Sequence, residues 1–210
     1  MLTVSLLSLI AGLFGGGEPL QEPTEHGLTR EWSPWRGEIG EGFAKNARTV
    51  EVKLSRAFGL TDTGSDFTHN LWLAQVQGGV MLAEVMEPDY WFGGNLEGTG
   101  QLMAGGQDRP EGAYLFGLNG GLRYHFRTGG PLVPFLGGSF GLALTDIGNP
   151  DASSKFQFNQ QAAAGAHYFV DRRHAISLEY AYWHVSNGGI RQPNAGVNAH
   201  VVSVGLAWLF

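Results

Sequence analysis

His184 and Ser186 are the two residues of this chain whose types and spacing suggest chemistry. They stand two positions apart at the start of the run HVSNGGIRQPNAG, residues 184–196. In a β-strand, residues at this spacing point to the same side and are neighbours. A serine hydroxyl becomes a nucleophile when a base takes its proton, and an imidazole is a suitable base. The pair is therefore a candidate for nucleophilic catalysis if a strand carries it.

The rest of this run supplies other groups that a hydrolase needs. A tetrahedral intermediate needs hydrogen-bond donors for its oxyanion, and the candidates are the backbone at Asn187, Gly188 and Gly189 and the side chain of Asn194. Glycines also let the backbone approach a substrate closely. Residues of these types are also common in ordinary turns. The alternative that His184 and Ser186 have no catalytic role therefore stays open.

Composition limits the class of protein. The chain has 210 residues, 33 glycines and no cysteine, and 15% of its residues are charged, against about 25% in soluble domains. This length corresponds to about one domain. The absence of cysteine excludes disulfides and thiol catalysis. A net charge of -6 without a basic cluster argues against nucleic acid as a partner.

The N-terminal part differs from the rest of the chain. The apolar run 2–14 is shorter than the roughly 20 residues that a membrane-spanning helix needs. It fits the apolar part of a secretory signal, although no lysine or arginine precedes it. We predict a signal segment over 1–17, an irregular segment over 18–46 and a β-barrel over 47–210.

From residue 48 onward the sequence alternates with a period of two. Segments rich in glycine, proline, asparagine and aspartate separate the alternating stretches, as expected for turns between strands. We predict eight strands, at 48–60, 69–83, 90–104, 113–126, 131–145, 155–170, 174–187 and 198–210.

One face of these strands is large and apolar, and the other is small or polar. Val50, Val52 and Leu54, for example, alternate with Glu51 and Lys53. A transmembrane barrel turns the apolar face to lipid and the polar face to its lumen. Long strands, aromatic residues near the strand ends and an aromatic C-terminus favour this arrangement, and closure removes exposed sheet edges. The prediction is an all-β fold, an eight-stranded antiparallel transmembrane β-barrel.

The interior of an eight-stranded barrel is filled by side chains, so the prediction is not a pore. Its polar residues are expected to form a packed core: Glu51, Lys53, Glu97, Arg123, Gln161 and Glu179. A soluble lipid-binding barrel with the apolar face turned inward stays an alternative.

Alternation places the candidate site on the apolar face. His184 and Ser186 continue the stripe that contains Tyr180, and Asn198 and His200 share this side in the next strand. Polar groups facing lipid are unfavourable and are therefore functional candidates. With an even number of strands, both chain ends lie in the periplasm and strand 174–187 ends outside. The site is thus expected to face the outer leaflet, where lipopolysaccharide carries ester-linked acyl chains.

The run from His184 to Gly196 resembles the signature of the PagL lipid A 3-O-deacylases, also called acyloxyacyl hydrolase-like proteins. The resemblance extends over about 48–210 and is sharpest near the C-terminus. It implies an outer-membrane barrel that hydrolyses the acyl ester at position 3 of lipid A with a surface Ser-His-Glu triad. It also implies that no cofactor or metal takes part. The implied partner is lipid A or lipopolysaccharide, and a homodimer is left open.

Carried over by this resemblance, Ser186 matches the nucleophile and His184 the catalytic histidine, but Asn198 occupies the position of the acid. An amide oxygen can accept a hydrogen bond from imidazole, yet it carries no charge to stabilise the imidazolium. Three alternatives stay open. Asn198 orients His184 in a slower hydrolase, or a carboxylate such as Glu179 substitutes, or the chain is a catalytically weak or inactive structural barrel.

The resulting prediction is an esterase of the Gram-negative outer membrane that removes an acyl chain from lipid A. Ser186 attacks the ester, His184 acts as base and then as acid, and Asn198 orients His184. His200 is interpreted as an interfacial residue. Outward aromatic side chains of the last three strands are expected to hold the acyl chain: Phe156, Phe158, Tyr168, Tyr180 and Tyr182.

Overall fold

The computed structural model describes residues 43–210, except 62–64, 66, 87–91 and 129. The predicted signal segment over 1–17 and most of the irregular segment over 18–46 therefore lie outside the described residues. Within the described residues, no helix is long and apolar enough to cross a membrane.

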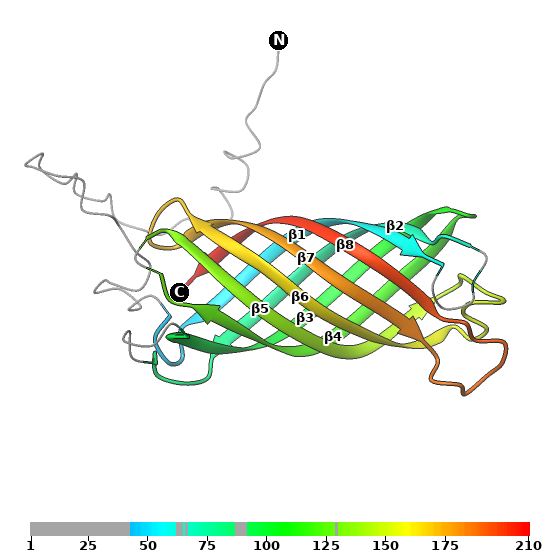
Figure 1. Ribbon diagram of the computed structural model, residues 1–210, viewed down its shortest axis with the longest axis horizontal. Helices are drawn as coiled ribbons and strands as arrows, with labels where there is room; N and C mark the ends of the chain where they lie inside the picture. The colour runs from blue at the N-terminus through cyan, green and yellow to red at the C-terminus, as the bar shows by residue number, and fades with distance from the viewer. Residues whose placement is uncertain (1–42, 62–64, 66, 87–91, 129) are drawn as a thin grey trace, which may run out of the picture. The chain divides into compact units, whose positions relative to one another are not determined.

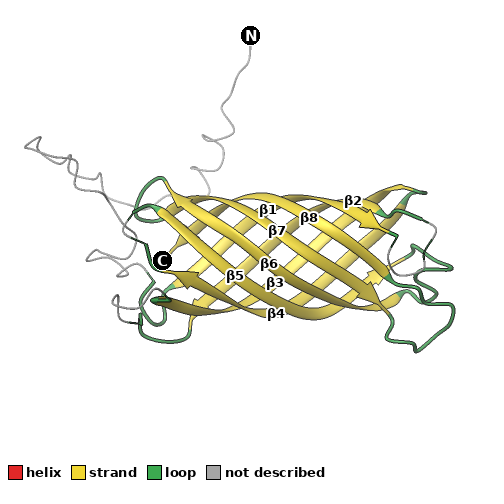
Figure 2. Ribbon diagram, viewed as in Figure 1, coloured by secondary structure: helices red, strands yellow, loops and turns green. Residues whose placement is uncertain are grey.

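Eight antiparallel strands form one closed barrel (Figures 1 and 2). Each strand pairs with its neighbours along the chain, and β8 closes the barrel on β1. This confirms the predicted fold class. The strands are β1 (Arg48–Leu60), β2 (Asn70–Met81), β3 (Gly94–Arg109), β4 (Ala113–Phe126), β5 (Leu132–Thr145), β6 (Phe156–Phe169), β7 (His174–Ser186) and β8 (Val197–Leu209).

The third strand differs most from its predicted bounds. Alternation predicts a strand over 90–104, of which 90 and 91 lie outside the described residues, but β3 runs from Gly94 to Arg109. Its last part has no apolar alternation that a sequence pattern could detect. The structure shows why: a Cβ on Gly105 would come within 2.5 Å of Leu73 Cδ2 on β2. The neighbouring strand supplies the interior side chain that β3 lacks there.

The apolar face of the barrel points outward, as predicted. Every strand exposes large apolar side chains on this face, among them Leu54, Trp72, Leu102, Phe116, Leu136, Tyr168, Leu178 and Val204, each more than half exposed. This arrangement contradicts the alternative of a soluble lipid-binding barrel, because that protein would bury the same residues.

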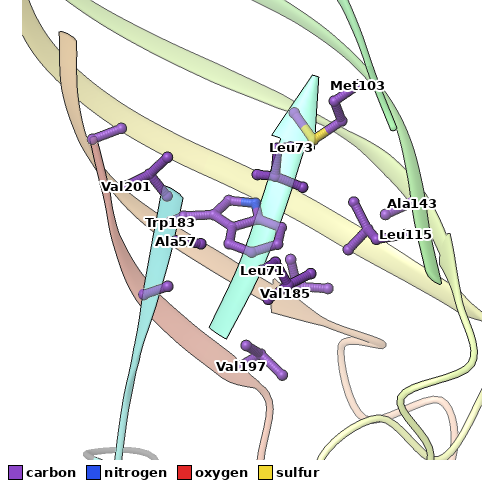
Figure 3. Packing of buried hydrophobic residues seen from close by; sticks show 12 residues of the cluster. Ala57, Leu71, Leu73, Met103, Leu115, Ala143, Trp183, Val185, Val197 and Val201 are labelled. Carbon is purple, nitrogen blue, oxygen red and sulfur yellow. The ribbon is translucent and has the colours of Figure 1, made fainter. Parts of the chain in front are cut away.

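The interior consists of three layers. We call the end where β1 begins and β8 ends the terminal end, and the opposite end the far end. Near the far end, Trp183 packs with Leu71, Leu73 and other buried apolar residues (Figure 3). Near the terminal end, Phe43 belongs to a second apolar cluster with Phe169. Charged residues fill the space between the two clusters.

The charged layer is centred on Arg123. Its guanidinium lies 2.9 Å from a Glu51 carboxylate oxygen and 3.0 Å from one of Glu179. Lys53 Nζ lies 2.7 Å from the other oxygen of Glu179. Glu97 is also buried here. The predicted polar core is confirmed for these residues, whereas Gln161 is half-buried beside them.

Replacing Arg123 with methionine is expected to destabilise the barrel by about 3–5 kcal/mol, because it leaves buried carboxylates without their cation. Urea unfolding in detergent micelles, followed by tryptophan fluorescence, measures this loss. Arg56→Met is the matched control, since Arg56 pairs with the half-exposed Asp108 on the outer face. Equal unfolding midpoints for the two variants would contradict a stabilising role for the charged layer.

Candidate active site

His184, Ser186 and Asn198 form a hydrogen-bonded chain on the outer face of the barrel. His184 Nε2 lies 2.9 Å from Ser186 Oγ, and His184 Nδ1 lies 2.6 Å from Asn198 Oδ1. The strands place these groups directly. Ser186 follows His184 on the same side of β7, and Asn198 stands opposite His184 in the pairing of β7 with β8.

The hydrogen-bond partners determine the tautomer of the imidazole. The amide oxygen of Asn198 only accepts hydrogen bonds, so His184 Nδ1 carries the proton and donates it. Nε2 is then free to accept the hydroxyl proton of Ser186. This is the arrangement that a base needs in order to activate a serine.

Glu179 does not take the place of the missing acid. It faces the lumen, and both of its carboxylate oxygens are engaged, by Lys53 and by Arg123. Of Glu179 and Asn198, Asn198 is the residue that contacts His184.

The loop after β7 is built around the Asn187 side chain, which is fully buried. Its Oδ1 accepts a hydrogen bond from Gly189 N–H at 2.9 Å, and its Nδ2 donates to Arg191 O at 2.8 Å. Asn194 Oδ1 accepts from Asn187 N–H at 3.1 Å. Two of the predicted oxyanion donors, the N–H groups of Asn187 and Gly189, are therefore used within the loop. The remaining candidates are Gly188 N–H and Asn194 Nδ2.

Gly196 brings the end of this loop against the candidate site. Its φ of 82° lies in the left-handed region that favours glycine. A Cβ at this position would lie 3.2 Å from His184 Cε1 and 3.4 Å from Ser186 Cβ. The backbone at Gly196 therefore packs directly on the His184–Ser186 pair.

A shallow groove on the outer face begins at His184. It has a volume of about 350 Å³ and crosses β6 to β5. Small residues, Gly138 and Ala162, lie along it, with Phe140 and Tyr182 beside them. We call this feature the surface groove.

Gln160 is a polar residue of this region that the sequence analysis missed. It stands opposite His184 in the pairing of β6 with β7, is exposed on the outer face and lines the surface groove. Strand alternation could have revealed that Gln160 faces outward, because it shares parity with Phe156 and Phe158, but its place beside His184 comes from the register of β6 with β7.

The aromatic residues predicted to hold an acyl chain do not all lie together. Phe158 stands opposite Ser186, and Tyr182 lines the surface groove. Tyr168 pairs with Ile176 near the start of β7 and so lies toward the terminal end, away from the site. Tyr180 OH lies 2.6 Å from His200 Nδ1, which gives this histidine a partner separate from the His184–Ser186 pair.

Comparisons with known proteins agree with this fold. The crystal structure of the outer membrane enzyme PagL aligns with a TM-score of 0.57 and 17% identity, covering 74% of this chain and 97% of that one. The crystal structure of Neisserial surface protein A (NspA) aligns with a TM-score of 0.55 and 17% identity, covering 79% and 100%. No curated protein sequence matches the chain.

The fold and these neighbours define an outer-membrane β-barrel protein of the Gram-negative type. The family model described as Lipid A 3-O-deacylase (PagL) matches residues 77–207. The chain belongs to this family.

The membrane location gives the barrel a direction. In outer-membrane barrels, short turns face the periplasm and longer loops face outward. Connections 146–155 and 187–196 at the far end are longer than turns 127–131 and 170–173 at the terminal end. Connection 82–93 at the terminal end and turn 110–112 at the far end do not follow this rule. From these loops and the even number of strands we predict that the far end, with loops 146–155 and 187–196 and the candidate site, is the external end.

Proposed function

We propose that this protein is an esterase that hydrolyses the ester-linked acyl chain at position 3 of lipid A in the outer leaflet. The observation that carries the proposal is the hydrogen-bonded chain of Ser186, His184 and Asn198 on the lipid-facing surface, with contacts of 2.9 and 2.6 Å. Family membership supports the choice of lipid A as the substrate.

The reaction begins when Ser186 Oγ attacks the ester carbonyl and His184 Nε2 takes the hydroxyl proton. The ring becomes an imidazolium that Asn198 holds through Nδ1–H. The negative charge on the carbonyl oxygen is met by donors of the loop, for which Gly188 N–H and Asn194 Nδ2 are the candidates. Gln160 is a further candidate to bind polar groups of the substrate, because it flanks His184.

Collapse of the tetrahedral intermediate breaks the bond to the sugar oxygen, which receives the proton from His184. An acyl-serine and a lipid A hydroxyl group are then present. In the second half, His184 takes a proton from water, and the resulting hydroxide attacks the acyl-serine carbonyl. Return of the proton to Ser186 Oγ releases the fatty acid.

The surface groove would hold the acyl chain of the substrate beside Ser186. Ala162→Phe fills it without entering the lumen and is expected to raise KM about tenfold, with a smaller change in kcat. Ala164→Phe is the matched control, since Ala164 is the next outward residue of β6 but does not line the surface groove. Kinetics on lipid A in mixed micelles measure both constants. A similar KM for the two variants would contradict the assignment of the surface groove.

Mass spectrometry of lipid A after incubation with the purified, folded protein tests the proposed function. We expect the loss of one ester-linked acyl chain, while the amide-linked chains stay in place. A lipid A mass that does not change would instead support the second candidate, a structural barrel without activity. The observation that favours this second candidate is the uncharged Asn198 in the position of the acid.

A further inference from the structure

A second buried chain of polar contacts lies at the far end, inside the mouth of the barrel. His69 Nε2 lies 2.8 Å from Asp151 Oδ2, and His69 Nδ1 lies 2.7 Å from Gln107 Oε1. All three side chains are buried. They come from the start of β2, the end of β3 and loop 146–155, so His69 connects this loop to the barrel wall.

The partners of His69 hold both nitrogens of its ring. Gln107 Nε2 donates to Glu111 O at 2.8 Å, which turns Gln107 Oε1 toward the imidazole. Both ring nitrogens of His69 thus face oxygen atoms, and the ring bridges Gln107 and Asp151. Asp151 Oδ1 has no hydrogen-bond partner among the described residues. His69 Nε2 is therefore the hydrogen-bond partner that holds this buried side chain.

Loop 146–155 in turn holds the loop that follows Ser186. Gly196 N–H donates to Asp151 O at 3.0 Å, and Ser153 Oγ donates to Arg191 O at 2.9 Å. Asn187 Nδ2 reaches Ser153 Oγ at 3.3 Å. The residue whose carboxylate binds His69 thus also binds, through its carbonyl oxygen, the glycine that packs on His184 and Ser186.

We propose that His69 and Asp151 are positioning residues for the His184–Ser186 pair. The contact between His69 and Asp151 anchors loop 146–155 to the barrel wall, and the carbonyl of Asp151 then fixes Gly196 against His184. Neither residue touches the reacting atoms. A small displacement of reacting groups lowers the rate strongly, so the anchor affects catalysis from a distance. The effect on catalysis rests on the proposed function, whereas the effect on the loop does not.

The test compares His69→Ala with His125→Ala in the full-length protein. His125 is a matched control, because it is also a buried histidine beside a carboxylate. It lies 2.9 Å from Glu97 near the terminal end of the barrel, away from both loops. Hydrogen exchange of backbone amides, followed by NMR in detergent micelles, reports on the loop without requiring activity. We expect His69→Ala to raise the exchange rate of Gly196 N–H at least about tenfold, and His125→Ala to leave it unchanged.

The rate at which a fluorophosphonate labels Ser186 reports on the site itself. We expect His69→Ala to slow labelling about tenfold, and His69→Gln, which keeps a donor for Asp151, to restore part of the rate. Asp151→Asn, which keeps the side-chain shape, serves where His69→Ala does not fold. Equal Gly196 exchange in wild type and in the His69 and Asp151 variants would overturn the proposal. Faster exchange combined with a wild-type Ser186 that is not labelled would support the anchor and count against the proposed function.

Discussion

Replacing Ser186 with alanine is expected to lower kcat for lipid A deacylation by at least about a thousandfold, because the attacking oxygen is removed. The hydroxyl lies on the outer face and bonds to His184 rather than to the core, so the barrel should fold as before. Mass spectrometry of lipid A over time gives the rate, and the shift in gel mobility on heating reports folding.

Ser177→Ala provides the control on the same strand. Ser177 is a buried, lumen-facing serine of β7, and its substitution removes an equal number of atoms. It should retain wild-type activity. Since Ser186 and His184 act as one unit, the double variant Ser186→Ala/His184→Ala should be no slower than either single variant. Acyl release by Ser186→Ala at the wild-type rate would remove Ser186 as the nucleophile.

Replacing Asn198 with glutamate is expected to raise kcat by at least about tenfold, with an upper bound near the ~10⁴-fold effect of the acid in serine triads. The Asn198 amide already lies 2.6 Å from His184 Nδ1, so orientation is present and negative charge is what the site lacks. A carboxylate there would stabilise the imidazolium that forms when Ser186 attacks.

Asn198→Gln separates charge from length, because it extends the side chain as glutamate does without adding charge. It should not exceed wild-type activity. Initial rates of acyl release, measured on the same lipid A preparation, compare the two variants. If Asn198→Glu is no faster than Asn198→Gln, then Asn198 does not occupy the place of a catalytic acid.

Much of the architecture could be predicted from alternation alone. A period of two assigns each residue to one face and predicts Glu51 and Lys53 inside and Val50 and Val52 outside, as the structure shows. The same rule placed His184, Ser186 and Asn198 on the outer face. It failed where alternation is weak, as in the second half of β3, where glycines replace the apolar residues.

Contacts between distant segments could not be predicted in this way. His69 and Asp151 are separated by four strands in sequence and meet only because the closed barrel brings their loops together. Likewise, Gln160 flanks His184 because of the register between β6 and β7, which no local pattern reveals.

The sequence was therefore sufficient for the fold class and for placing His184 and Ser186 side by side on the outer face, because these depend on local periodicity and residue type. Only the tertiary structure decided which group meets His184 Nδ1, which loop donors are already used, and how loop 146–155 supports Gly196. The physical reason is strand register and barrel closure, which set the distances between side chains on different strands.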